Sequence, residues 1–122
     1  MTGSVNDLLE PILKVAVKDS GGHIHQFETL IDTGFNGYLT LPSNLITAFG
    51  LPWLFRQQAE LADGSFETFD VHKAIIIWDD ALLTVEVEAV DAIPFIGMGV
   101  LDGYALRVDV TRGGSVKIES LP

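Results

Sequence analysis

The chain has 122 residues, 48% of them hydrophobic, and contains no cysteine. This length fits one packed domain, expected over residues 1–122, and the missing cysteines exclude a disulfide framework and a thiolate zinc site. Seventeen acidic and seven basic residues give a formal net charge of −10, which repels polyanions and anionic lipid surfaces, so neither nucleic acid nor a membrane is an expected partner.

The first ten residues contain no basic stretch followed by an apolar run, which does not fit a signal peptide. The longest apolar stretches, such as 74–78, are too short to span a bilayer. We therefore expect a soluble protein of the cytoplasm.

Most of the chain alternates apolar and polar residues with a period of two, which predicts half-buried strands. The predicted strands cover 13–18, 23–31, 55–62, 66–78, 83–90, 104–110 and 116–119. One helix is predicted between Pro42 and Gly50, and a second helical turn over 98–102. Many short strands with one or two short helices indicate a closed all-β domain, a barrel.

The pair Asp63-Gly64 is the best hairpin turn in the sequence, because both central positions of a type I′ turn need a positive φ angle. Two long strands flank it, so this turn predicts either a projecting hairpin or an ordinary turn of a meander.

The segment that indicates chemistry is 29–42, in which an apolar strand leads directly into Asp32-Thr33-Gly34. A turn follows at Asn36-Gly37, and a second apolar strand leads to Leu41-Pro42. A carboxylate placed directly after two buried apolar residues suggests that Asp32 lies at the floor of a cavity. A plainer interpretation is that Asp32 caps its own turn by accepting hydrogen bonds from the amides of Gly34 or Phe35.

The sequence Leu-Ile-Asp-Thr-Gly-Phe-Asn-Gly at 30–37 resembles the active-site segment of aspartic peptidases, most closely that of small bacterial retropepsin-like members. A second segment, Phe-Ile-Gly-Met-Gly-Val-Leu at 95–101, resembles the family's later apolar-apolar-Gly segment. The resemblance implies the closed acid-protease barrel, with pseudo-symmetry between 30–32 and 95–97. It also implies that Gly97 is small because the active-site loop passes close by, and that the hairpin at Asp63-Gly64 is the mobile flap.

Peptide hydrolysis in this family uses a water molecule and two carboxyl groups that share one proton. The chain contains a single Asp-Thr-Gly motif, so the second carboxyl must come from a second copy across a two-fold axis. The resemblance therefore implies a homodimeric aspartic endopeptidase with Asp32 as its catalytic residue. It needs no metal and no organic cofactor.

The resemblance also implies roles for the neighbouring residues. Thr33 is expected to hydrogen-bond across the dimer axis, and Gly34 to allow close approach of the backbone. Asp63, Gly64 and Ser65 are expected to close over an extended peptide or protein substrate. Retroviral members usually have a small residue after the glycine, and Phe35 departs from that pattern.

Two alternatives remain open at this stage. The chain could be a catalytically silent peptide-binding or dimerisation module that retains the fold. His23 and His25 could ligate a metal from one strand face, although two ligands without a third nearby are more typical of a solvated surface. Asp79-Asp80 is interpreted as a polar turn.

Overall fold

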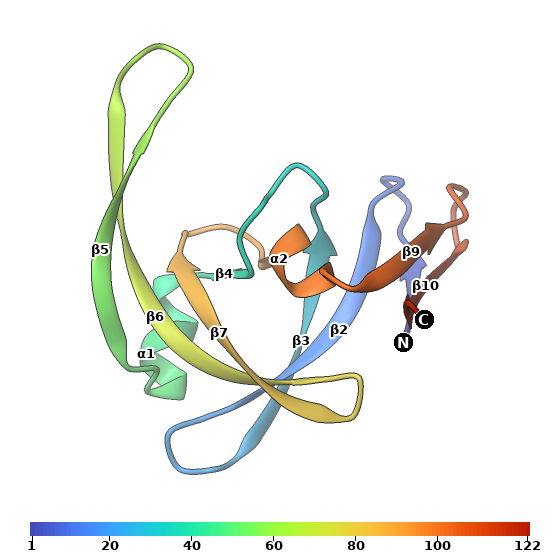
Figure 1. The fold of residues 1–122 in the computed structure, drawn as a ribbon, viewed down its shortest axis with the longest axis horizontal. Helices are drawn as coiled ribbons and strands as arrows, with labels where there is room; N and C mark the ends of the chain where they lie inside the picture. The colour runs from blue at the N-terminus through green and yellow to red at the C-terminus, as the bar shows by residue number, and fades with distance from the viewer.

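The computed structural model describes residues 1–122 and consists mainly of strands (Figure 1). The strands are β1 (Thr2–Val5), β2 (Pro11–Lys18), β3 (Ile24–Ile31), β4 (Leu39–Leu41), β5 (Trp53–Glu60), β6 (Phe66–Trp78), β7 (Ala81–Ala89), β8 (Phe95–Ile96), β9 (Tyr104–Val108) and β10 (Ser115–Ser120). Two short helices, α1 (Ser43–Phe49) and α2 (Met98–Leu101), follow β4 and β8. The predicted all-β class with short helices is confirmed.

All ten strands belong to one sheet in the order β5-β6-β7-β4-β8-β3-β2-β1-β10-β9. An additional pairing joins β2 to β6, with Val17 opposite Ile76, and this pairing links two distant positions in that order. The strands β2, β3, β8, β4, β7 and β6 therefore pair in a closed circuit. Two extensions leave it: the β5–β6 hairpin on one side, and β1, β10 and β9 on the other (Figure 1).

The hydrophobic core lies among the strands of this circuit. Val17, Leu39, Val87 and Ile96 have no exposed surface, and they come from four different strands of the circuit. Full burial of each such side chain contributes roughly 1.5–3 kcal/mol. The predicted alternation is confirmed over the middle of β2 and β7, whereas Leu83, near the turn end of β7, is exposed.

The first helix has the predicted boundaries. Its buried residues Ile46 and Phe49 face the core, and Gly50 ends it with a left-handed backbone at φ 62° and ψ 39°. The amide of Gly50 donates to the carbonyl oxygen of Thr47, and the amide of Leu51 donates to that of Ile46. These bonds satisfy carbonyl groups that the end of a helix leaves free. The predicted second helical turn is also confirmed, as α2.

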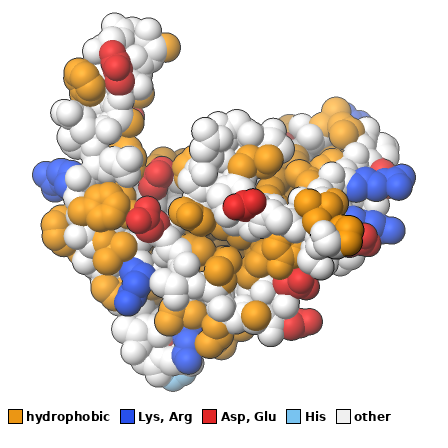
Figure 2. All heavy atoms as spheres, viewed as in Figure 1, with side chains coloured by type: hydrophobic (Ala, Val, Ile, Leu, Met, Phe, Trp, Pro, Cys, Tyr) orange, Lys and Arg blue, Asp and Glu red, His pale blue; other side chains and the backbone are white.

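The long hairpin formed by β5 and β6 projects from the rest of the chain, as the space-filling view also shows (Figure 2). Its predicted type I′ turn is wrong, because Gly64 has a positive φ, of 84°, and Asp63 does not. The connection is a three-residue loop in which Leu61 and Ser65 are hydrogen-bonded neighbours. The carboxylate of Asp63 accepts a hydrogen bond from the amide of Ser65 at 2.9 Å, which stabilises this wider loop.

A turn with two positive φ angles occurs instead at Asp79-Asp80, between β6 and β7, where the φ angles are 51° and 63°. The flanking pair is Trp78 opposite Ala81, so the loop has two residues, as a type I′ hairpin requires. The predicted polar turn is confirmed.

Two parts of the strand prediction need correction, one near each end of the chain. Strand β9 ends at Val108, and Val110 is exposed in the turn that follows. Strand β1 was not predicted; it pairs with β2 and with the C-terminal strand β10. The chain contains no helix with the length and apolar character needed to cross a lipid bilayer.

Candidate active site

Asp32 lies directly after β3, at a point where β3 runs parallel to β8. The register places Leu30 opposite Phe95 and Ile31 opposite Ile96. The amide of Asp32 donates a 2.9 Å hydrogen bond to the carbonyl oxygen of Ile96. Because Ile31 and Ile96 are both buried, this bond fixes the half-buried Asp32 at the edge of the core.

The Asp-Thr-Gly loop is stabilised by its own aspartate. Oδ1 of Asp32 accepts a 2.9 Å hydrogen bond from the amide of Gly34, and the carbonyl oxygen of Asp32 accepts one from Phe35 at 3.2 Å. The turn-capping contact considered from the sequence is therefore present. It uses one carboxylate oxygen and leaves Oδ2 available to a ligand.

The segment around Gly97 lies directly against the residues that follow the Asp-Thr-Gly motif. A Cβ atom added to Gly97 would overlap the carbonyl oxygen of Gly37 and lie 2.8 Å from that of Phe35. In the same region, the amide of Gly97 donates to Tyr38 and that of Met98 donates to Phe35. The prediction that residue 97 is small because the Asp-Thr-Gly loop passes close by is confirmed.

Thr40 is a supporting residue that sequence reasoning missed. It lies in β4 with 5% of its surface exposed, and its Oγ1 accepts a 2.9 Å hydrogen bond from the amide of Phe95. This contact fixes the start of β8 beside Asp32. A hydroxyl between Leu39 and Leu41, in a strand that is otherwise apolar, is the signal that could have identified it.

A hollow of about 360 Å³ opens beside Asp32, and we call it the Asp32 hollow. It is lined by Leu9, Glu10, Pro11, Leu30, Ile31, Asp32, Thr33 and Phe95. Asp32 and Thr33 thus lie at a concave surface together, whereas Gly34 is exposed in the loop beyond them. The expectation that Asp32 borders a cavity agrees with this geometry.

The other predicted site residues lie elsewhere. Asp63, Gly64 and Ser65 form the exposed tip of the long hairpin, and none of them lines the Asp32 hollow (Figure 1). Hydrogen bonds from the hydroxyl and the amide of Ser65 lower the pKa of Asp63. A Cβ atom added to Gly64 would meet no atom within 4 Å, so the space beside Gly64 is open. The single chain does not bring the two groups of predicted residues together.

The two histidines in the first hairpin contact an aspartate. Nε2 of His25 lies 2.8 Å from Oδ2 of Asp19, and its ring stacks on Phe49 at 4.8 Å. The amide of His23 donates to Oδ1 of Asp19. No group of three His, Cys, Asp or Glu side chains is arranged to hold a metal ion.

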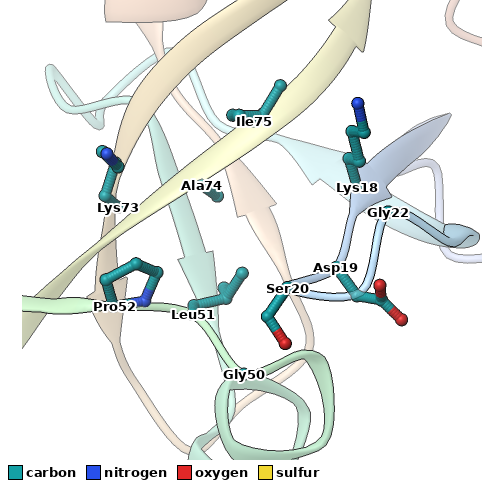
Figure 3. Close-up of a pocket in the computed structure, with 10 residues that line it drawn as sticks. All are labelled: Lys18, Asp19, Ser20, Gly22, Gly50, Leu51, Pro52, Lys73, Ala74 and Ile75. Atoms are coloured by element: carbon teal, nitrogen blue, oxygen red, sulfur yellow. The ribbon is translucent and has the colours of Figure 1, made fainter.

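A second concave surface, of about 420 Å³, lies away from Asp32, where β2 and β6 diverge near the end of α1 (Figure 3). Lys18 and Lys73 border it from these two strands, and Leu51 and Pro52 border it from the segment after α1. None of the predicted site residues is among its walls. It is therefore separate from the Asp-Thr-Gly loop.

No protein-family model and no curated protein matches the sequence. Among solved structures, the chain is similar to a retropepsin-like aspartic protease from Rickettsia conorii, with a TM-score of 0.61 and 11% sequence identity. The match covers 100% of this chain and 92% of that protein. The fold implied by the sequence resemblance is thereby confirmed.

Proposed function

We propose that this chain, which has the fold of retropepsin-like aspartic proteases, is an aspartic endopeptidase that acts as a homodimer. The observation that carries the proposal is the position of Asp32. Its motif follows a central strand, its amide is bound to Ile96, and its carboxylate borders a hollow. The domain over residues 1–122 would form one half of a two-fold site.

The proposed chemistry follows from two carboxyl groups in contact. One ionised carboxylate takes a proton from water, and a protonated partner donates toward the scissile amide. Two carboxyl groups about 3 Å apart cannot both ionise, so they share one proton. Each copy supplies one Asp32, and the pair forms where two copies meet at the two-fold axis. Water and carboxyl groups suffice, so the reaction needs no metal or organic cofactor.

The neighbouring residues of the loop support this pairing. A Cβ atom added to Gly34 would lie 3.3 Å from Oδ1 of Asp32, which is tighter than ordinary van der Waals contact. Glycine at this position therefore leaves the carboxylate undisturbed. Thr33 is exposed beside Asp32 in a single copy, as a residue that hydrogen-bonds across the dimer axis would need to be.

We propose that the long hairpin is the flap. Its strand β5 is an edge strand with almost every side chain exposed, and its tip carries Asp63, Gly64 and Ser65. Such a hairpin can bend over an extended peptide and pair with its backbone as an added strand. Substrate would then lie between the flap and the paired Asp32 carboxyls.

Since the chain lacks cysteine, it suits a reducing compartment, and we propose the cytoplasm.

One observation favours a second candidate, a catalytically silent peptide-binding or dimerisation module. Oδ1 of Asp32 accepts the amide of Gly34 within its own turn, so an aspartate would stabilise this loop even without chemistry. The presence of Asp32 alone does not separate the two functions.

The experiment that separates them is cleavage of a mixed peptide library between about pH 4 and pH 7 by the wild type and by Asp32→Asn. Asparagine keeps an Oδ1 atom that can accept the hydrogen bond from Gly34, so the turn is preserved while the carboxyl group is lost. Both proteins are compared at equal dimer content, measured by analytical ultracentrifugation. Cleavage by the wild type that vanishes in Asp32→Asn supports the peptidase. No cleavage by a wild type shown to be dimeric would support the module.

A further inference from the structure

The walls of the Asp32 hollow have two different chemical characters. Leu9, Pro11 and Phe95 supply apolar surface, and Glu10 is, with Asp32, one of two acidic residues among the walls. No lysine or arginine is among the residues that line it, and Glu10 takes part in no ion pair. A hollow with apolar walls and an acidic group matches a side chain that has an aliphatic stem and a cationic end.

The position of Glu10 is fixed by the loop that precedes it. Oε1 of Glu10 accepts a 3.0 Å hydrogen bond from Nδ2 of Asn6. Oδ1 of Asn6 in turn accepts from the amides of Leu8 and Glu10, at 3.0 and 2.9 Å. Leu9, between these two, has a left-handed backbone with φ at 61°. One hydrogen bond therefore holds the carboxylate of Glu10 directly, and two more hold its partner Asn6 in place.

A third hollow, of about 540 Å³, lies between the β6 arm of the long hairpin and the segment at the end of β7, and its lining is also acidic. Its acidic residues are Glu67, Glu88, Asp91 and Asp70, of which Asp70 forms an ion pair with Arg56, and neither lysine nor arginine lines it. Glu88 also approaches the Asp-Thr-Gly loop, since its Oε1 would lie 3.4 Å from a Cβ atom added to Gly37. On the face shown in Figure 2, acidic side chains lie near the middle and also at the hairpin tip and along the lower right, while Lys and Arg lie toward the left, right and lower edges. The surroundings of Asp32 thus favour positively charged ligands.

We infer that the Asp32 hollow binds a lysine or arginine side chain of the peptide substrate, with Glu10 as the residue that selects the positive charge. The inference rests on the proposed peptidase function and specifies its substrate class. The aliphatic stem would lie along Leu9, Pro11 and Phe95, and the cationic group would meet Glu10. Glu10 acts here as a specificity-determining residue and takes no part in bond cleavage.

The test uses a set of peptides that differ at one position beside the cleaved bond, carrying Lys, Arg, Gln, Met or Glu there. The wild type is expected to cleave the Lys and Arg peptides with a kcat/KM about tenfold above that for Gln and Met, the factor typical of one charge-assisted contact. Glu10→Gln should remove this preference while still accepting the hydrogen bond from Asn6. Glu10→Lys should shift the preference toward the Glu peptide.

A matched control separates the local effect from the general one. Glu28→Gln removes the same charge from an exposed position on β3 outside the Asp32 hollow, and it should keep the wild-type preference. The inference is wrong if the wild type shows no preference for Lys and Arg, or if Glu10→Gln leaves the preference intact. It is also wrong if Glu10→Gln only weakens dimerisation, because Glu10 would then be an interface residue.

The proposed function and this inference can fail separately. If the dimeric wild type cleaves no peptide, the peptidase proposal fails, and the Lys and Gln peptides are then compared by fluorescence anisotropy as ligands. Tighter binding of the Lys peptide that is lost in Glu10→Gln would support the role of Glu10 in a binding module. Equal binding of the two peptides would overturn it.

Discussion

The aromatic ring of Phe35 lies against Gly97, and a Cβ atom added to Gly97 would stand 2.6 Å from the Cδ2 atom of Phe35. The same ring would lie 2.5 Å from a Cβ atom added to Gly37. The large residue after the Asp-Thr-Gly motif thus occupies space left by two glycines. The ring of Phe35 packs against Gly37 and Gly97, which gives a structural reason for its departure from the small residue of retroviral members.

The first prediction concerns Gly97→Ala. The added methyl group would overlap the carbonyl oxygen of Gly37, and because backbone is involved, the loop must move. We expect the free energy of unfolding to fall by about 1–3 kcal/mol, as for other overpacked sites, and peptide cleavage to fall more than stability explains. Urea unfolding and cleavage assays at matched folded concentration measure the two effects.

Gly103→Ala is a suitable comparison for this variant. Gly103 has a positive φ of 87°, but a Cβ atom there would meet nothing within 4 Å. Its replacement should cost about 1–2 kcal/mol through backbone strain and leave the activity of the folded protein unchanged. Equal activity in the two variants would mean that the Gly97 contact does not position the Asp-Thr-Gly loop.

The second prediction concerns Thr40→Val. Valine has nearly the same shape but cannot accept the hydrogen bond from the amide of Phe95, so that amide would lose its partner. An unsatisfied buried group costs about 1–3 kcal/mol, and we expect a loss of that size in urea unfolding. Thr40→Ser keeps the acceptor and loses only a methyl group, about 0.8 kcal/mol. A Val variant as stable as the Ser variant would contradict the assigned contact.

The third prediction concerns the acid stability of the β2–β3 hairpin. A hydrogen bond from His25, followed by one from the amide of His23, lowers the pKa of Asp19 from 3.8 to about 2. As the pH falls, the unfolded chain binds this proton before the folded one does. The stabilisation is therefore complete above about pH 4 and is lost as the pH falls toward about 2.

Denaturant unfolding of the wild type and of Asp19→Asn between about pH 2 and pH 7 tests this sign. The variant should be less stable near neutral pH, and the difference between the two proteins should shrink as the pH falls below about 4. His25→Ala, which removes the largest cause of the pKa shift, should reduce the difference in part. A difference that stays constant to about pH 2 would show that Asp19 stabilises the turn without its charge.

The elements that were predicted well depend on signals close together in sequence. Alternation identified β2 and β7, and Pro42 with Gly50 bounded α1, because each depends on neighbouring residues. The parallel register that joins Leu30-Ile31 to Phe95-Ile96 was not predicted, since pairing across so many residues leaves no local pattern, and the family resemblance implied only a pseudo-symmetry between the two segments.

The predictions that were wrong or missing also have physical causes. Strand β1 is short, contains Gly3, and exists because the C-terminal strand β10 and β2 flank it. The turn at Asp63-Gly64 looked suited to a type I′ geometry, but the Asp63 carboxylate binds Ser65 and favours the three-residue loop. Asp79-Asp80 adopts that geometry instead, because the pairing of β6 with β7 continues to Trp78 and Ala81 and leaves two residues for the turn. Side-chain contacts such as Thr40 with Phe95 need the fold before they can be identified.

The last prediction concerns Gly64→Val at the tip of the long hairpin. Gly64 has a φ of 84°, and a β-branched residue in this left-handed region is strained by about 1–2 kcal/mol or more. A Cβ atom there would meet no atom within 4 Å, so the cost is backbone strain alone, and the free energy of unfolding should fall by about 1–2 kcal/mol, as for Gly103→Ala. If the tip closes over substrate, the strain opposes closure, and kcat/KM should fall about tenfold, since about 1.4 kcal/mol corresponds to that factor.

Gly64→Asn is the matched control, because asparagine tolerates this backbone conformation and should retain most of the activity. A Val variant that cleaves peptides as fast as the wild type would show that the tip takes no part in binding substrate, whereas an equal loss in both variants would assign the requirement to the absence of a side chain and not to the backbone angle.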